Sequence, residues 1–573
     1  MGSCVGVPMK VSRVSRLAAL FILVLIELSC GDTYRPVAVP LPPSPPNPGA
    51  LHYMLIVTGN GPINPGAALR LDESGDTAAA QAQAGLGPVH LGILPNGNRT
   101  YIANSMDDTV SSFASSTPNS VATTVIPKVP NPSNPAQLYN PVPIFVQTGD
   151  NNVLYVVNNA YPTPPATPIP GTVDVITVAT NVVTNIIPVG VNPVALLETA
   201  DMNHVYAVNQ GNTTTPGSVT SIDPVSKTVK STITNGFALG SYPAWIVQRS
   251  DNQKVYVLNT GSGTVTSIDT LSDTVTCGVS GLPACPVVGA GANYMIYDTF
   301  LNRLYVTNPV TNNLVTLNVA VDPPTVMFTT GVAASPTSVT ALTDGTRVYV
   351  GSLKQGSPCT STPGDTRPCI QTQVTVLNAN DMSLRSVIPL QASVAVTAAM
   401  EDTAGQNTTY TYSTASGPPL QAGMTVVITG MADPGNNGTF LVGSVAGNGF
   451  TVANTLGVTN SGQSGTAASV IEVDTTDATG CTVNGLGTPG GVIGGARFRM
   501  FMQTGASNQR VYAGTCDAGS TTIIRTVSES SAGTSYPPDT IVLNIFSAPS
   551  AFPPPMPGLQ PPPQNPLFVF ASP

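Results

Sequence analysis

The sequence predicts an all-β fold in which four-stranded blades stand in a ring, a β-propeller, and two observations lead to this prediction. A phrase that starts with tyrosine and ends three residues later with asparagine occurs at Tyr101, Tyr155, Tyr206, Tyr256 and Tyr305. From Tyr53 to Tyr349 the steps between successive tyrosines of this series are 48, 54, 51, 50, 49 and 44 residues. A β-rich phrase that returns every 40 to 50 residues or so is typical of a propeller with one blade per repeat.

The composition agrees with short strands joined by turns. The chain of 573 residues has 54 glycines and 55 prolines, and only 9% of its residues are charged. A hydrophobic content of 41% is enough to fill a large core. Because blades pack around one axis, this length does not require several separate domains. The net charge of −9 and the lack of a Lys/Arg cluster beyond the first residues exclude nucleic acid as an expected partner.

One repeat shows how a blade is built. In the best copy, residues 243–248 form an apolar inner strand and residues 254–259 form the tyrosine strand. Residues 264–269 alternate as a half-buried third strand, and the outer strand starts at Thr274. Polar turns separate these segments, which is the pattern of an antiparallel meander.

Weaker copies of the tyrosine strand at Tyr53, Tyr349 and Tyr512 bring the predicted number of blades to eight. Seven blades is the alternative, because the first or last unit could be an appendage. The unit at Tyr53 has no inner strand of its own, whereas residues 565–570 form a strand without a blade. We expect this C-terminal strand to complete the first blade, which would leave the ring with no open edge.

An insertion is predicted between the last two repeats. Tyr349 and Tyr512 are 163 residues apart, although one blade needs about 50. Segments 423–430, 436–442 and 449–454 resemble strands with Asn-Gly turn signals. The predicted domains are therefore a first propeller segment at 51–392, a small β module at 393–472, and a second propeller segment at 473–573.

The repeated phrases resemble the YVTN-type β-propeller repeat family, which is found in bacterial and archaeal surface or periplasmic proteins. The resemblance covers about residues 50–392 and 495–573, although the copies at Tyr349 and Tyr512 lack the asparagine. It implies a place outside the cytoplasm but no fixed ligand, because one fold hosts many activities.

The N-terminus predicts export. Lys10, Arg13 and Arg16 precede an apolar stretch at 17–28, which is short for a membrane span. Residues 28–31 resemble a bacterial lipobox, so we expect a signal peptide at 1–29 and a lipid on Cys30, with Glu27 as a departure from that motif. Plain secretion and a retained anchor are the alternatives. Residues 30–50 are a proline-rich linker, either a stiff spacer or a disordered leader.

The cysteines agree with export. Six of the eight lie beyond Cys30, and an even number in an exported chain predicts disulfides. We expect three pairs: Cys277 with Cys285, Cys359 with Cys369, and, by elimination, Cys481 with Cys516. A zinc site is disfavoured by the lack of C-x-x-C spacing and by only three histidines.

No catalytic residues, cofactor or metal site are predicted. His52, His90 and His204 are the only histidines, and the last two are expected on the surface or in packing positions. The repeated asparagines and Asp174, Asp223 and Asp269 are expected to cap turns, although the aspartates could also form a ring of calcium ligands. Trp245 is expected in the core or lining the channel.

These features favour a non-enzymatic, envelope-anchored binding or scaffold protein. Its partners would be the membrane, through the lipid, and an unknown protein or glycan. A lactonase-like hydrolase acting on the propeller face is the first alternative. A metal- or quinone-dependent oxidoreductase is the second.

Overall fold

A computed structural model describes residues 52–60, 64–116, 121–131, 134–148, 150–160, 169–356, 369–472, 481, 499–531, 534–546 and 565–572. The predicted signal peptide at 1–29, the linker at 30–50 with its lipidation site Cys30, and Cys359 lie outside these residues.

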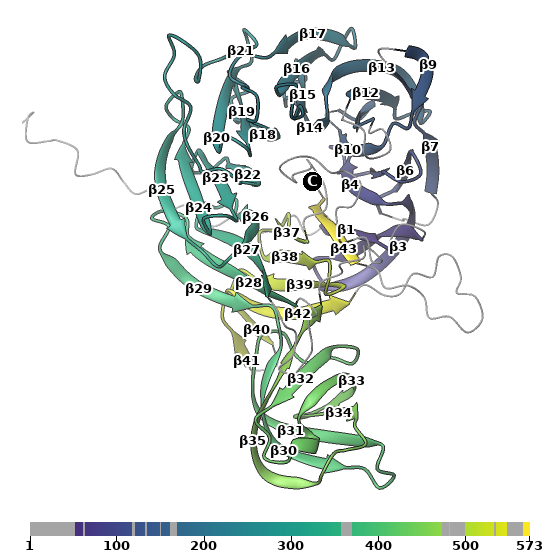
Figure 1. Cartoon of the computed structure of the whole chain (residues 1–573), viewed down its shortest axis with the longest axis vertical. Helices are drawn as coiled ribbons and strands as arrows, with labels where there is room; N and C mark the ends of the chain where they lie inside the picture. Colours follow the sequence, from purple (N-terminus) through teal and green to yellow (C-terminus); the bar gives the residue numbers. More distant parts are fainter. Residues whose placement is uncertain are drawn as a thin grey trace, which may run out of the picture. The chain divides into compact units, whose positions relative to one another are not determined.

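Eight four-stranded antiparallel sheets form the blades of a propeller (Figure 1). In blade order, the inner strands are β43 (Asn565–Ala571), β4 (Pro88–Ile93), β10 (Pro143–Gln147), β14 (Pro193–Glu198), β18 (Pro243–Gln248), β22 (Tyr294–Asp298), β26 (Pro336–Ala341) and β37 (Met500–Thr504). The second strands, which carry the repeated tyrosine, are β1 (Tyr53–Gly59), β5 (Arg99–Asn104), β11 (Val153–Asn158), β15 (Val205–Asn209), β19 (Lys254–Asn259), β23 (Arg303–Asn308), β27 (Arg347–Gly356) and β38 (Arg510–Thr515).

The third strands are β2 (Pro65–Asp72), β6 (Thr109–Ala114), β12 (Pro170–Thr177), β16 (Ser218–Asp223), β20 (Thr264–Asp269), β24 (Asn313–Asn318), β28 (Cys369–Asn378) and β39 (Ser520–Arg525). The outer strands are β3 (Thr77–Leu86), β7 (Val121–Val125), β13 (Val182–Val191), β17 (Thr228–Ile233), β21 (Thr274–Val275), β25 (Thr325–Gly331), β29 (Leu384–Pro389) and β42 (Thr540–Phe546). Two hairpins lie outside the blades, β8 (Val129–Asn131) with β9 (Asn134–Tyr139), and β40 (Glu529–Ser531) with β41 (Thr534–Tyr536).

The two ends of the described chain close the ring. Strand β43 pairs antiparallel with β1, and Phe568 lies opposite Val57. The Ser572 amide donates to the Tyr53 carbonyl at 2.8 Å. Blade 1 therefore has three strands from the N-terminal end and one from the C-terminal end, as expected from the sequence. Because the units at Tyr53 and Tyr512 are both complete sheets, the prediction of eight blades is confirmed and the alternative of seven is wrong.

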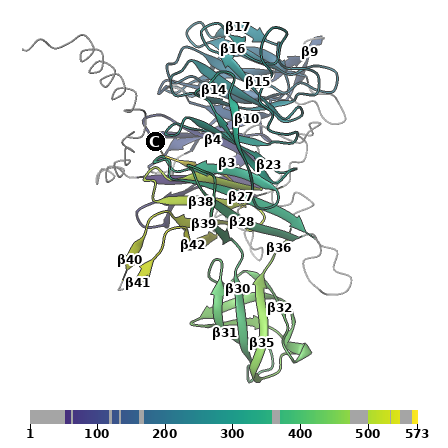
Figure 2. The same cartoon turned by 90° about the vertical axis from the view of Figure 1, so that its left-hand side faces the viewer.

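The insertion between blades 7 and 8 is a closed six-stranded barrel with its own apolar core. Its strands are β30 (Ser393–Glu401), β31 (Asn407–Ser416), β32 (Thr425–Thr429), β33 (Gly438–Ala446), β34 (Gly449–Ala453) and β35 (Asn460–Ser469), with one 3-10 turn, η1 (Pro434–Asn436). Ser393 pairs with Ala468, so the barrel begins and ends at one place. After the barrel, the short strand β36 (Ile471–Glu472) returns to pair with β28 of blade 7 (Figure 2).

The repeated asparagines do not play the role expected from the sequence. In four blades the asparagine is buried, and its amide donates to one or two side chains of the next strand. Asn209, for example, donates to the Ser218 and Thr220 hydroxyls at 3.1 and 2.9 Å. Asn104, Asn158 and Asn259 do the same. Only Asn308 among these five caps a turn, through the amides of Val310 and Thr311. The asparagine of the repeated phrase thus links the second strand to the third strand, because a buried side-chain amide needs hydrogen-bond partners.

The repeated tyrosine belongs to a contact between neighbouring blades. In six blades a basic residue lies two positions before this tyrosine: Arg99, His204, Lys254, Arg303, Arg347 and Arg510. Five of these six belong to the chain's 20 lysines and arginines. Four of these side chains lie against an aspartate from the turn before the outer strand of the following blade. We call these four contacts the blade latches.

In two of the latches the aspartate also accepts a hydrogen bond from the hydroxyl of the repeated tyrosine. Asp539 accepts from Arg347 at 2.6 Å and from the Tyr349 hydroxyl, and its own side chain is 5% exposed. Asp273 accepts from the Tyr206 hydroxyl at 2.7 Å and pairs with Lys230 at 3.1 Å. Both aspartates have a positive φ, of 60° and 53°, a conformation that Asp tolerates better than most residues.

Candidate functional site

The two faces of the propeller differ in the lengths of their connections. Turns from first to second strand have four to six residues, and turns from third to fourth strand have the same lengths except at 526–539. Because strands alternate in direction, both kinds lie on one face, which we call the short-turn face. Connections on the other face vary from one residue to the 110 that include the barrel, and long ones lie at 126–142, 159–169, 234–242 and 276–293. We call this the insertion face.

The disulfides also gather on the insertion face. Cys277 and Cys285 are bonded within the connection 276–293, and Cys516 in the second turn of blade 8 is bonded to Cys481. Cys369 at the start of β28 is disulfide-bonded, and its predicted partner Cys359 lies outside the described residues. Both pairs that the structure describes were predicted correctly. Disulfides indicate an oxidising compartment and stiffen the loops that they join.

The channel at the centre of the ring is filled by aromatic side chains. Six of them follow one another around it, with ring centroids 3.9 to 6.0 Å apart: His90, Phe145, Trp245, Tyr294, Phe501 and Phe568. We call this the aromatic belt. Its members other than Trp245 are at most 6% exposed. The belt consists of three phenyl rings, one indole, one phenol and one imidazole, so the channel is a packed core at this level.

A repeated irregularity directs these side chains inwards. His90, Phe145 and Trp245 each come two residues after the proline that opens their inner strand, and the register shifts between the two positions. Such a β-bulge turns the following side chain relative to the regular pleat. The same proline and register shift occur at Pro193 and Pro336, where Ala195 and Ser338 follow, so the proline marks the bulge but not an aromatic side chain.

His90 is packed among the aromatic side chains of the belt. Its ring stacks on Phe145 at 3.9 Å, and its Nδ1 accepts from the Val146 amide at 3.4 Å. Burial lowers the pKa of His90 to about 3, so the imidazole is neutral at ordinary pH. His204 lies beside Asp273 at 3.6 Å in a blade latch, and burial lowers its pKa as well. The expectation of packing positions fits both histidines.

The three aspartates have different roles. Asp223 and Asp269 accept from backbone amides of the next turn, as expected for caps. Asp174 instead lies in the middle of β12 and is fully buried, so the expectation of a cap is wrong there. Burial raises the pKa of Asp174 to about 7, although hydrogen bonds with Thr172 and Asn158 oppose the shift. Asp174 occupies the position that Thr220 holds in blade 4 and Thr266 in blade 5.

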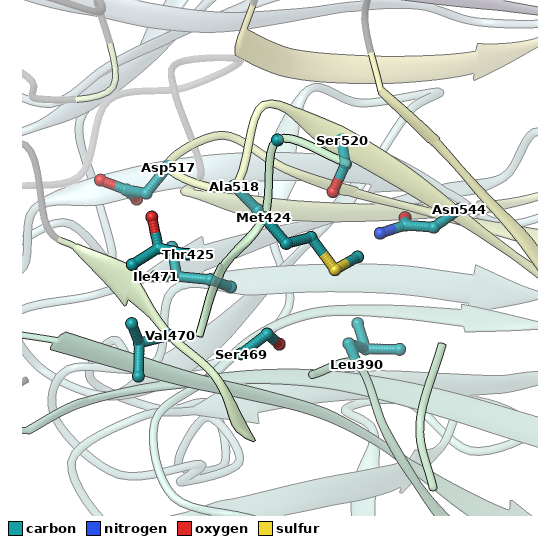
Figure 3. A pocket seen from close by; sticks show the side chains of 11 residues that line it. Leu390, Met424, Thr425, Ser469, Val470, Ile471, Asp517, Ala518, Ser520 and Asn544 are labelled. Atoms are coloured by element: carbon teal, nitrogen blue, oxygen red, sulfur yellow. The ribbon is translucent and has the colours of Figure 1, made fainter. Parts of the chain in front are cut away.

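A cleft of about 330 Å³ lies on the insertion face where the barrel meets blade 8 (Figure 3). Met424, Thr425, Ser469, Val470 and Ile471 line it from the barrel and its exit. Blade 8 contributes Asp517, Ala518, Ser520 and Asn544, and Leu390 and Gly423 complete the lining.

Several ties fix the walls of this cleft. The Gln421 side-chain amide donates to the Asn544 carbonyl at 3.2 Å, and the Ser469 amide donates to the Ala392 carbonyl at 2.7 Å. The pairing of β36 with β28 is a third tie. The cleft is therefore held open by contacts within the fold and is prepared before any ligand enters it. Sequence reasoning missed it, because its two walls are far apart in the chain.

Within the described ranges, no group of three or more His, Cys, Asp or Glu side chains is arranged to hold a metal ion. The same part of the chain contains no helix long and apolar enough to cross a lipid bilayer.

Comparison with known proteins finds structural likeness at low sequence identity only. No protein-family model and no curated protein matches the chain. Among solved structures, a periplasmic gluconolactonase of Pseudomonas aeruginosa is 14% identical, with 59% of this chain and 95% of that chain covered and a TM-score of 0.37. Hydrazine synthase of Kuenenia stuttgartiensis is 15% identical over 55% and 90% of the chains, with a TM-score of 0.39. The Cps50 propeller domain of Myceliophteria thermophila is 9% identical over 52% and 94%, with a TM-score of 0.37.

Proposed function

We propose that this chain is an exported, non-enzymatic binding protein that recognises its partner with the insertion face. The observation that carries the proposal is the asymmetry of the propeller: the barrel, nearly all long connections and the disulfide-bonded cysteines belong to one face. Loops on a rigid scaffold are the usual carriers of recognition. Disulfides add stiffness where a binding surface gains most from it.

The positions of the chain ends support this choice of face. Tyr53 and Ser572 meet on the short-turn face, opposite the barrel insertion. We propose that Cys30 carries a lipid and that the chain belongs to the YVTN-type repeat family, as its repeats and leader suggest. An anchor attached upstream of Tyr53 would tether the short-turn face and leave the insertion face free to bind.

The packing of the channel favours binding over hydrolysis. A propeller hydrolase would need polar catalytic groups near the axis, whereas this chain places the aromatic belt there. The neutral, stacked His90 has no carboxylate beside it among the contacts of the described residues. Within those same ranges, the most buried aspartates belong to latches, to ion pairs, to a strand interior or, at Asp298, to a turn cap.

The test compares the two faces in one binding assay. Cell-envelope fragments of a bacterium that produces the protein are sedimented with the mature chain and with three variants. Excising 393–469 joins Ala392 to Val470, which are already neighbours through the Ser469–Ala392 hydrogen bond, so the propeller can close. Val310→Arg changes a 71% exposed side chain on the insertion face, and Leu271→Arg changes a 91% exposed one on the short-turn face.

We expect barrel excision and Val310→Arg each to weaken envelope binding at least fivefold, and Leu271→Arg to leave it unchanged. Equal losses for both arginine variants would contradict the choice of face. Turnover of lactones or esters by the mature chain, abolished by substituting a residue of either face, would contradict the non-enzymatic function.

A further inference from the structure

We propose that the cleft between the barrel and blade 8 binds an uncharged sugar unit of a glycan. This inference rests on the proposed function and names the ligand of one site on the insertion face. It is carried by two nearly buried polar side chains that point into the cleft, by the apolar side chains opposite them, and by the balance of charge around them.

Asn544 and Ser520 supply the polar edge of the site. Asn544 is 7% exposed and Ser520 is 3% exposed. The Asn544 Oδ1 accepts from the Thr522 hydroxyl at 2.9 Å, which fixes the amide and turns its Nδ2 towards the cleft, as Figure 3 shows. Among the described residues, neither this Nδ2 nor the Ser520 hydroxyl has a hydrogen-bond partner. Both groups face the cleft, where the oxygens of a ligand can take the place of water as their hydrogen-bond partners.

The opposite wall carries apolar side chains beside the Thr425 and Ser469 hydroxyls. The Met424 side chain crosses the cleft in Figure 3, and Leu390 and Ile471 lie along the same cavity. Met424 and Leu390 are 8% and 5% exposed, so a small part of their hydrocarbon surface is open to a ligand. A thioether adapts its shape to the group that it contacts. The ligand therefore needs oxygens along one edge and an apolar face on the other, as a pyranose ring has.

The charge balance excludes an ionic ligand. Asp517 is the one carboxylate in the lining, its side chain is fully buried, and it pairs with Arg499 at 2.6 Å. The cavity volume is at the lower end of the range of about 300–1,000 Å³ for small-molecule sites. An extended peptide would need a longer groove, and a peptide end would bring an unpaired charge. A neutral sugar unit fits the small volume of the cleft and brings no charge into it.

The experiment uses the mature, oxidised chain and isothermal titration with cellobiose, maltose, lactose and chitobiose. Digalacturonic acid serves as the charged counterpart, and a neutral blocked tripeptide as the alternative class. Ser520→Ala and Asn544→Ala each remove one polar group from the cleft. Ser218→Ala is the matched control, because Ser218 opens the third strand of blade 4 as Ser520 opens that of blade 8. Thermal midpoints verify that each variant is folded.

We expect at least one neutral disaccharide to bind, with affinity at least fivefold lower in Ser520→Ala and Asn544→Ala and unchanged in Ser218→Ala. Three outcomes would overturn the inference. Sugar affinity could be unchanged in both cleft variants, or digalacturonic acid could bind more tightly than the neutral disaccharides. The tripeptide could also bind in place of a sugar, with its affinity lowered by the cleft variants. Failure of every sugar together with face-dependent envelope binding would overturn the sugar site and leave the proposed function standing.

Discussion

The blade latch between the last and first blades gives the sharpest test of how the ring is held together. Arg510 of blade 8 donates three hydrogen bonds to the two carboxylate oxygens of Asp76 in blade 1, at 2.9, 3.0 and 3.1 Å. Both side chains are 10% exposed, so water screens the pair little. The substitution Asp76→Asn removes the charge and one acceptor while keeping a residue that tolerates the φ of 50° at this position.

The expected cost follows from this geometry. A hydrogen bond to a charged group contributes about 1.5–3 kcal/mol, and removing one partner of a buried pair costs about 3–5 kcal/mol. Asparagine keeps one acceptor, and Glu529 still pairs with Arg510. We therefore expect Asp76→Asn to lower the free energy of unfolding by about 2–3 kcal/mol. The matched control is Asp251→Asn, whose partner Arg249 lies at 2.8 Å but whose carboxylate is 42% exposed, and it should cost under about 1 kcal/mol.

The assay is urea unfolding followed by the fluorescence of Trp245, the single tryptophan, which lies in the aromatic belt. A double-mutant cycle with Arg510→Met isolates the pair from other effects of each substitution. A coupling energy near zero, or equal costs for Asp76→Asn and Asp251→Asn, would refute the claim that latches act as buried ion pairs.

Three further predictions concern buried groups. The pKa of His90 is about 3 in the folded chain, so below pH 6.5 the unfolded chain binds the proton more readily. The free energy of unfolding should therefore fall as the pH drops from 6.5 towards 3, by about 2 kcal/mol at pH 5. His90→Phe should abolish this pH-dependent component when unfolding is measured at pH 7 and pH 5. For Asp174, whose pKa is raised to about 7, the free energy of unfolding changes with pH in the opposite direction: its stabilising contribution is lost as the pH rises from 3.8 through about 7. Asp174→Thr should therefore stabilise the chain more at pH 8 than at pH 4 in the same unfolding assay. Replacing Cys481 and Cys516 by serine opens a loop of 35 residues and should cost about 3–4 kcal/mol, and an unchanged urea midpoint would show that the fold does not depend on this bond.

Much of the fold could be predicted from the sequence, because each repeat has the same pattern of strands and turns. The spacing of Tyr101 to Tyr305 indicated one blade per phrase, and the unpaired strand at 565–570 indicated how the ring closes. The insertion was visible from the long step to Tyr512. Its closed barrel was not, since β30, β31 and β35 carry threonine, alanine and glycine without a strong alternation of apolar residues.

The roles of side chains within the repeat were harder to predict. Asn209 looked like a turn cap because it ends a strand, whereas its amide turns sideways to hydroxyls of the next strand. Only tertiary burial distinguishes these two uses of one residue type. The latches, in contrast, left a plain signal in the Arg-x-Tyr and Lys-x-Tyr spacing, as in Arg347 and Tyr349. The spacing does not identify the acidic partner, because the structure is needed to show that the next blade places Asp539 beside Arg347.

The candidate site shows where sequence reasoning ends in this architecture. The choice of face depends only on chain order: strands alternate in direction, so the position of each connection in the strand order assigns it to a face, and the lengths on the two faces can be compared without coordinates. The cleft depends on a contact of another kind, since Gln421 and Asn544 are 123 residues apart and belong to different modules. No repeat relates them, and neither residue type is unusual on its own. A recognition face can thus be inferred from a propeller sequence, whereas the chemistry of its ligand depends on how an insertion packs against one particular blade.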